Sequence, residues 1–157
     1  MAGSRQTIIG RSSYNFDNLG SGVTKTIVLA RGIDMCAARE VALDVRVHSN
    51  GISADGPTFV VALWGENPAA DDPAKDFLLG TGADDQTEIA KVTIYSTVHS
   101  GTPTKAPVLL RACAAAGVGS GAAPWVGSFG RVVLIASGNS GSQPQNAVIS
   151  ADLILKS

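Results

Sequence analysis

The sequence has little charge of either sign. Only 16% of its 157 residues are Asp, Glu, Lys or Arg, and the formal net charge at pH 7 is -1. Ordinary soluble domains have about a quarter of their residues charged. Because no basic block is present, the chain offers no electrostatic footprint for nucleic-acid phosphates, and we expect no nucleic-acid partner. The low charge also leaves much of the surface neutral, which indicates that partners cover part of it.

Strong helix formers are scarce as well. Glu occurs only at positions 40, 66 and 88, whereas Val and Ile far outnumber Leu and 18 residues are Gly. This composition is typical of an all-β protein. No apolar run is long enough to span a membrane, and residues 1–13 lack the apolar core of a signal peptide. We therefore expect the protein to be made in a cytoplasm and not to associate with a membrane.

Cysteine is also rare. Cys36 and Cys113 have no metal-ligand spacing and no companion within a turn of either. We expect both to be reduced, buried and packed as small hydrophobic side chains. A disulfide would require a fold that brings their Cα atoms within about 7 Å.

The clearest pattern present is the alternation in residues 39–48. Val41, Leu43, Val45 and Val47 fall on one face, opposite a face of mostly polar residues. A period of two over this length predicts a half-buried β-strand. Seven further segments are rich in β-branched residues and bounded by turn formers, and they lie at residues 7–9, 22–30, 58–64, 86–96, 108–114, 131–137 and 149–155.

About eight strands with little or no helix predict two stacked antiparallel sheets, a sandwich of the jelly-roll type. A closed barrel is the alternative, and the sequence leaves the strand order open. Residues 1–22 are polar and rich in turn formers, so we expect an N-terminal arm or edge strand, followed by one sandwich domain over 23–157. Residues 33–38 could form a single helical turn capped by Asp34.

Two of these strands are apolar on both faces. If Phe59, Val61 and Leu63 point into the core, then Val60, Ala62 and Trp64 point outward, and the segment 131–137 has the same character. A two-layer domain has only one inner face per sheet, so the second apolar face needs a loop, the N-terminal arm or another subunit as cover.

Catalytic candidates are few. His48 and His99 are the only histidines, and each follows a predicted strand, which is typical of solvated strand ends. Either could serve a small hydrolase if a nucleophile and a carboxylate converged on it, but the chain has no G-x-S-x-G motif. We expect no catalytic residue.

Metal, phosphate and sugar sites have equally weak signals. A group of carboxylates could gather around Ca²⁺ but lacks EF-hand spacing, and its members are Asp71, Asp72, Asp76, Asp84 and Asp85. The stretch 117–121 (GVGSG) lacks the Lys-Ser/Thr of a phosphate loop and is interpreted as a linker. Trp64 and Trp125 could stack on sugars, although Trp64 ends an apolar strand and suits the core. We expect no cofactor and no metal.

The segment from Ile33 to Phe77 resembles small jelly-roll proteins of tailed-bacteriophage heads. The similarity lies in AREVALDVRVHS, in GPTFVVALW and in the loop GENPAADDPAKD at residues 65–76, which has prolines and acidic residues and is followed by Phe77. These relatives are cement or decoration proteins on the outside of a capsid. The resemblance implies a non-enzymatic structural protein of the virion that contacts the major capsid protein and other copies of itself.

Three hypotheses follow. A structural assembly protein predicts an oligomer or a shell-bound state. A carbohydrate-binding β-sandwich module predicts an exposed Trp125. A small hydrolase predicts a pocket that contains His48 or His99.

Overall fold

The computed structural model describes residues 3–16, 19–20, 22–51, 59–66, 88–96, 98, 106–115, 129–138 and 146–157. Within these ranges the regular secondary structure is entirely β-strand, as the sequence predicts. The strands are β1 (Gly3–Asn15), β2 (Thr24–Asp34), β3 (Glu40–Asn50), β4 (Phe59–Glu66), β5 (Glu88–Ile94), β6 (Val108–Ala115), β7 (Phe129–Ser137) and β8 (Asn146–Lys156). None of the described residues belongs to a helix long and apolar enough to cross a lipid bilayer.

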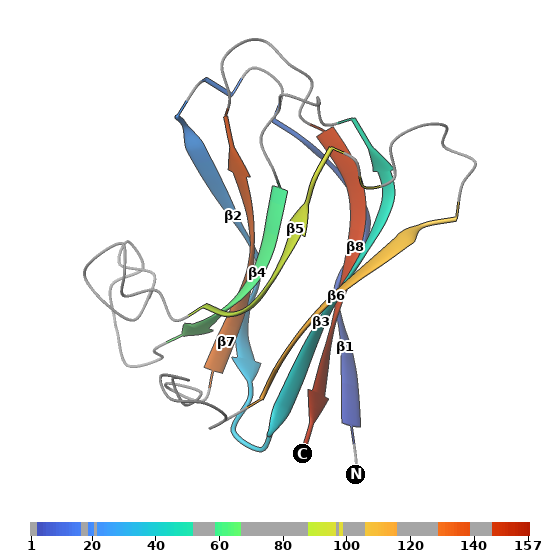
Figure 1. Ribbon diagram of the computed structural model, residues 1–157. Helices are drawn as coiled ribbons and strands as arrows, with labels where there is room; N and C mark the ends of the chain where they lie inside the picture. The colour runs from blue at the N-terminus through green and yellow to red at the C-terminus, as the bar shows by residue number, and fades with distance from the viewer. Residues whose placement is uncertain are drawn as a thin grey trace.

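The strands form two facing four-stranded antiparallel sheets (Figure 1). The first sheet has the order β1-β8-β3-β6, and the second has the order β2-β7-β4-β5. The first strand pairs with the last, and the pairing continues inward from both ends of the chain: β1 with β8, β2 with β7, β3 with β6 and β4 with β5. The chain is therefore one long antiparallel hairpin wound over two sheets, which is the jelly-roll arrangement.

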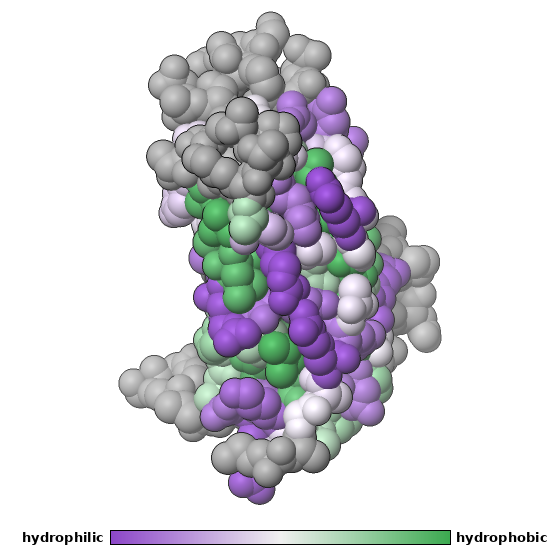
Figure 2. All heavy atoms as spheres, turned by 90° about the vertical axis from the view of Figure 1, so that its right-hand side faces the viewer, coloured by the Kyte–Doolittle hydropathy of each residue, from purple (hydrophilic) through white to green (hydrophobic). Residues whose placement is uncertain are grey.

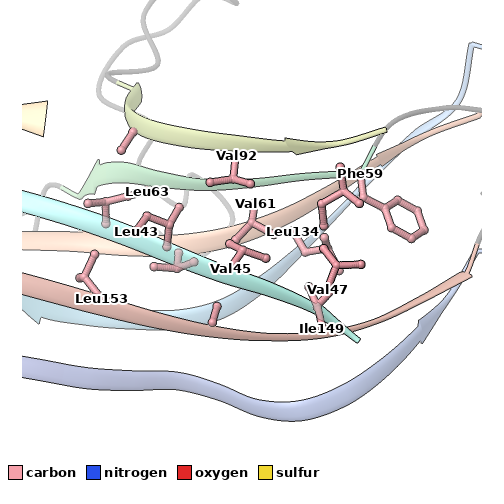
Figure 3. Close-up of a cluster of buried hydrophobic side chains, with 14 of the residues drawn as sticks. Leu43, Val45, Val47, Phe59, Val61, Leu63, Val92, Leu134, Ile149 and Leu153 are labelled. Atoms are coloured by element: carbon pink, nitrogen blue, oxygen red, sulfur yellow. The ribbon is translucent and has the colours of Figure 1, made fainter. Parts of the chain in front are cut away.

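The core lies between the sheets. The predicted strand at residues 39–48 is β3, and its inward side chains Val41, Leu43, Val45 and Val47 are fully buried, as the alternation predicts. Figure 3 shows Leu43, Val45 and Val47 of this row beside side chains of the second sheet and of β8, namely Phe59, Val61, Leu63, Val92, Leu134, Ile149 and Leu153. Burying such aliphatic side chains contributes about 1.5–3 kcal/mol each before the entropy cost of folding.

The predicted helical turn at residues 33–38 is wrong. Ile33 and Asp34 end β2, and a tight turn follows in which the Ala38 N–H donates to the Met35 carbonyl at 3.0 Å. Ile33 and Met35 are both buried, a spacing of two that suits a strand rather than a helix. Asp34 does act as a cap, because its Oδ1 accepts a hydrogen bond from the Cys36 N–H at 2.9 Å.

Residues 3–15 form an edge strand rather than a detached arm. β1 pairs with β8 from Gly3 to Asn15, with two register shifts along the way. Ile8, Ile9 and Tyr14 pack against the core. Just after β1, the Phe16 ring contacts the Phe59 ring edge-on, with 5.4 Å between the ring centroids. Because β1 is paired along β8 and packs Ile8, Ile9 and Tyr14 against the core, it is an integral part of the sandwich.

Candidate functional site

His48 lies within β3 and not after its end. The strand continues to Asn50 and remains paired with β8, with one register shift between Val47 and Ser49. His48 is half-buried on the outer face of the first sheet, where its Nε2 lies 3.0 Å from the Oγ of Ser150. The sequence did not single out Ser150, because the pairing of β3 with β8 brings it there.

A histidine beside a serine invites comparison with a hydrolase. In a triad, a carboxylate holds the second imidazole nitrogen. The carboxylate of Asp152, two residues from Ser150 on β8, instead accepts hydrogen bonds from Arg5, Arg46 and Thr7. This carboxylate is therefore bound to cations rather than to the imidazole.

Several sequence candidates lie outside the described residues. These are His99, Trp125, the stretch 117–121, the loop residues 67–76, and the five aspartates at 71, 72, 76, 84 and 85. Among the residues that the structure does describe, no group of three or more His, Cys, Asp or Glu side chains is placed to hold a metal ion.

The outer face of the first sheet carries an ion-pair network across all four strands. On β3 and β6, Asp44 receives two hydrogen bonds from Arg111, from Nε at 2.5 Å and from Nη2 at 2.7 Å. On β8, Asp152 is bound by Arg5 of β1, by Arg46 of β3 at 2.6 Å and by the Thr7 hydroxyl at 2.9 Å. Figure 2 shows hydrophilic side chains running down this side of the molecule.

The network keeps both carboxylates ionised. Hydrogen bonds from Arg111 lower the pKa of Asp44 below its ordinary value of 3.8, against the burial that raises it. Burial raises the pKa of Asp152, but hydrogen bonds from Arg5, Arg46 and Thr7 together lower it below 3.8. The two buried anions in turn hold three partly exposed arginine side chains in fixed positions.

The outer face of the second sheet is apolar at its centre, with the Lys91–Glu88 ion pair of β5 and Arg131 of β7 beside this apolar region. Ala62, Trp64 and Val133 form a second buried cluster on this face, with Val60 and Ile135 half-buried beside it. The outward orientation predicted for these side chains is thus confirmed. Trp64 is only 6% exposed, and the Arg131 guanidinium lies 5.3 Å from its ring centroid. The cluster reaches the surface at Val28, which pairs with Val133 and is 40% exposed.

Neither Cys36 nor Cys113 is in a disulfide and both are exposed, so the expectation of buried thiols is wrong. Cys36 sits in the turn after β2, and Cys113 is on the outer face of the edge strand β6.

Cys36 also borders an open cavity of about 350 Å³ with Ser4, Asp34 and Lys156. There the Asp34 carboxylate caps the turn and Lys156 pairs with Glu40 at 3.4 Å, so these charged groups have structural partners.

Comparison with known proteins gives two weak structural similarities and assigns no family. No protein-family model matches the sequence, and no curated protein does. The fold is similar to a chain in the structure of the Gx strain of infectious bursal disease virus, with a TM-score of 0.49 and 10% identity over 98% of this chain and 31% of that chain. It is similarly close to a chain of the infectious bursal disease virus VP2 subviral particle, with a TM-score of 0.49 and 14% identity over 98% of this chain and 32% of that one. This chain thus spans about a third of either protein, and because both similarities are weak we infer function from its own residues.

Proposed function

We propose that this protein is a structural protein of a virion that binds the outside of a capsid shell as a decoration protein. Its partners in this role are the major capsid protein and further copies of itself. Jelly rolls recur in viral capsid proteins and in lectins, so the fold is compatible with the role without specifying it.

The observation that carries the proposal is the difference between the two outer faces. The first sheet presents ion pairs, as an ordinary solvated sheet does. The second sheet has an apolar cluster around Trp64 that is largely buried within this chain and that reaches the surface at Val28, which is 40% exposed. A protein seated on a shell needs this asymmetry, because one side meets the shell and the other meets water.

The lectin-like alternative fits the described residues less well. A sugar-stacking aromatic must present its ring face to solvent. Trp64 is buried, and Arg131 covers its ring. This tryptophan therefore contributes to packing on the second sheet and not to a sugar platform.

The test is co-sedimentation with shells assembled from the major capsid protein encoded in the same genome. We expect saturable binding to assembled shells and none to the unassembled capsid protein. The matched pair of variants is Val28→Lys, on the apolar face, and Ser13→Lys, on the exposed edge of β1. Val28→Lys should weaken shell binding while Ser13→Lys leaves it unchanged. Absence of shell binding by the wild-type protein, or binding that neither variant alters, contradicts the proposal as stated.

A further inference from the structure

The four edge strands of the sandwich differ in how they are protected against pairing with another chain. Edge strands are usually protected by bulges and by charged side chains. β1 and β2 each have two register shifts, and β5 carries Glu88 and Lys91 beside a shift in its pairing with β4. β6 pairs with β3 without interruption from Ala115 to Val108. Its one charged residue, Arg111, is bound to Asp44.

The same edge has exposed apolar side chains at one end. Val108 is 37% exposed, Leu109 is 47% exposed, and Tyr95, just after β5, is 56% exposed. Val108 pairs with Val47 of β3, and Asn50, three residues further along β3, donates hydrogen bonds to the carbonyls of Tyr95 and Val98 at 2.8 Å. Tyr95 therefore lies at the same end of the sandwich as Val108 and Leu109. An open, regular and apolar edge of this kind favours addition of another strand.

The sequence of β6 is complementary to itself. Three large residues, Val108-Leu109-Leu110, precede Arg111, and three small ones, Ala112-Cys113-Ala114, follow it. In an antiparallel pair of two β6 strands centred on Arg111, each large residue lies opposite a small one: Val108 opposite Ala114, Leu109 opposite Cys113, and Leu110 opposite Ala112. Leu109 and Cys113 are on the outer face, whereas Leu110, Ala112 and Ala114 pack inward, so each pair joins side chains of the same face.

We propose that a second copy of this chain binds at β6, by antiparallel pairing centred on Arg111, and joins the two first sheets into one sheet of eight strands. The two Arg111 side chains meet at the twofold axis, where each has the carboxylate of its own Asp44 at 2.5 Å and 2.7 Å. Their mutual repulsion is thereby offset. A slip by one residue would set inward side chains against outward ones, and a slip that moves the centre to Leu110 would place Leu109 opposite Arg111.

This inference deepens the proposed assembly role by naming the contact between copies, and it can fail independently because its test uses purified protein without shells. One strand pair buries little area, so the dimer should depend on concentration in solution and strengthen when copies are held on one lattice.

The first experiment is disulfide trapping with Leu109→Cys. Directly opposite residues in an antiparallel pair have Cα atoms about 4.5–5.5 Å apart, within the range of a disulfide. Under mild oxidation this variant should form a covalent dimer in which Cys at position 109 is linked to the partner's Cys113, as identified by peptide mass spectrometry. Within one chain, positions 109 and 113 are about 13 Å apart along the strand and cannot be bridged.

Three controls define the register. The wild-type protein, Val108→Cys, and Leu109→Cys combined with Cys113→Ser should form no disulfide-linked dimer at β6 under the same oxidation, since none places two thiols opposite each other. A dominant link between two copies of Cys113, or equal trapping of Val108→Cys, would refute the pairing centred on Arg111.

The second experiment is sedimentation velocity on Leu109→Lys, with Ser13→Lys on the opposite edge of the same sheet as the matched control. Leu109→Lys should weaken self-association by about tenfold or more while its melting temperature stays near that of wild type, because the side chain is exposed. Ser13→Lys should self-associate like wild type. A wild-type protein that is monomeric up to its solubility limit, or a dimer unaffected by Leu109→Lys, would overturn the proposal.

Discussion

Asp44 and Asp152 lie directly opposite each other on the neighbouring strands β3 and β8, and both carboxylates are buried. Like charges in this position normally destabilise a sheet. Here Arg111 binds one carboxylate, and Arg5 and Arg46 bind the other, so the network links β1, β8, β3 and β6. The arginines offset the repulsion between the two anions. The resulting cross-strand ion pairs require both carboxylates to remain ionised.

The first prediction concerns acid stability. Both carboxyl groups have a pKa below the ordinary 3.8 in the folded protein, so their contribution is complete well above that pH and is lost as the pH falls through the folded-state pKa. Asp44→Asn combined with Asp152→Asn should reduce stability at neutral pH and flatten its decline between about pH 5 and pH 2. Urea denaturation across this range measures both effects; an unchanged acid slope would show that other carboxyl groups control the transition.

The second prediction is that Val45→Asp unfolds the domain. Val45 is fully buried at the centre of β3, between Leu110 and Ala151. An unpaired carboxylate there should cost several kcal/mol, comparable to the total stability of a domain of about 5–15 kcal/mol. Circular dichroism melting gives the answer, with Ser13→Asp on exposed β1 as the control. A cooperative melt within a few degrees of wild type would contradict the assigned core.

The third prediction concerns β1. Deleting residues 3–12 removes the contacts of Arg5 and Thr7 with Asp152 and the packing of Ile8 and Ile9. We expect a clear drop in the urea midpoint, because β8 loses its edge partner and Asp152 loses two of its three donors. If the truncated protein unfolds at the wild-type midpoint, these residues are dispensable for the fold.

The fourth prediction compares two aromatic residues. Trp64→Ala should destabilise the protein by about 3 kcal/mol or more, because the ring is buried on the second sheet under Arg131. Tyr95→Ala, at a position that is 56% exposed, should change stability by no more than about 0.5 kcal/mol. Equal effects in chemical denaturation would show that the outer cluster adds no packing energy.

The fifth prediction concerns the thiols. Cys36, on a turn, and Cys113, on an edge strand, are both exposed and outside a disulfide. Titration of the denatured protein without reductant should find two reactive thiols per chain, and both should also react in the native state. Finding no thiol in the denatured protein would establish a disulfide instead.

The sequence by itself determined the approximate positions of most strands and the faces they bury, although it placed only residues 7–9 of β1 in a strand. Alternation in residues 39–48 predicts the inward row of β3, and the two-faced apolar segments predict the outward orientation of Trp64 and Val133, because side-chain direction in a strand is a local property of the backbone. Asp44 and Arg46 could likewise be placed on the polar face.

Only the tertiary structure decided which residues meet. Arg5 and Asp152 are 147 positions apart, and they bind each other because β1 pairs with β8. The pairing of His48 with Ser150 and the exposure of Cys113 on an outermost strand depend on strand order in the same way. The turn at Asp34 was misassigned because a short apolar run suits a helical turn or a strand end equally well, until the packing of Ile33 and Met35 selects the strand. Partners across a sheet follow from long-range pairing, which no local pattern encodes.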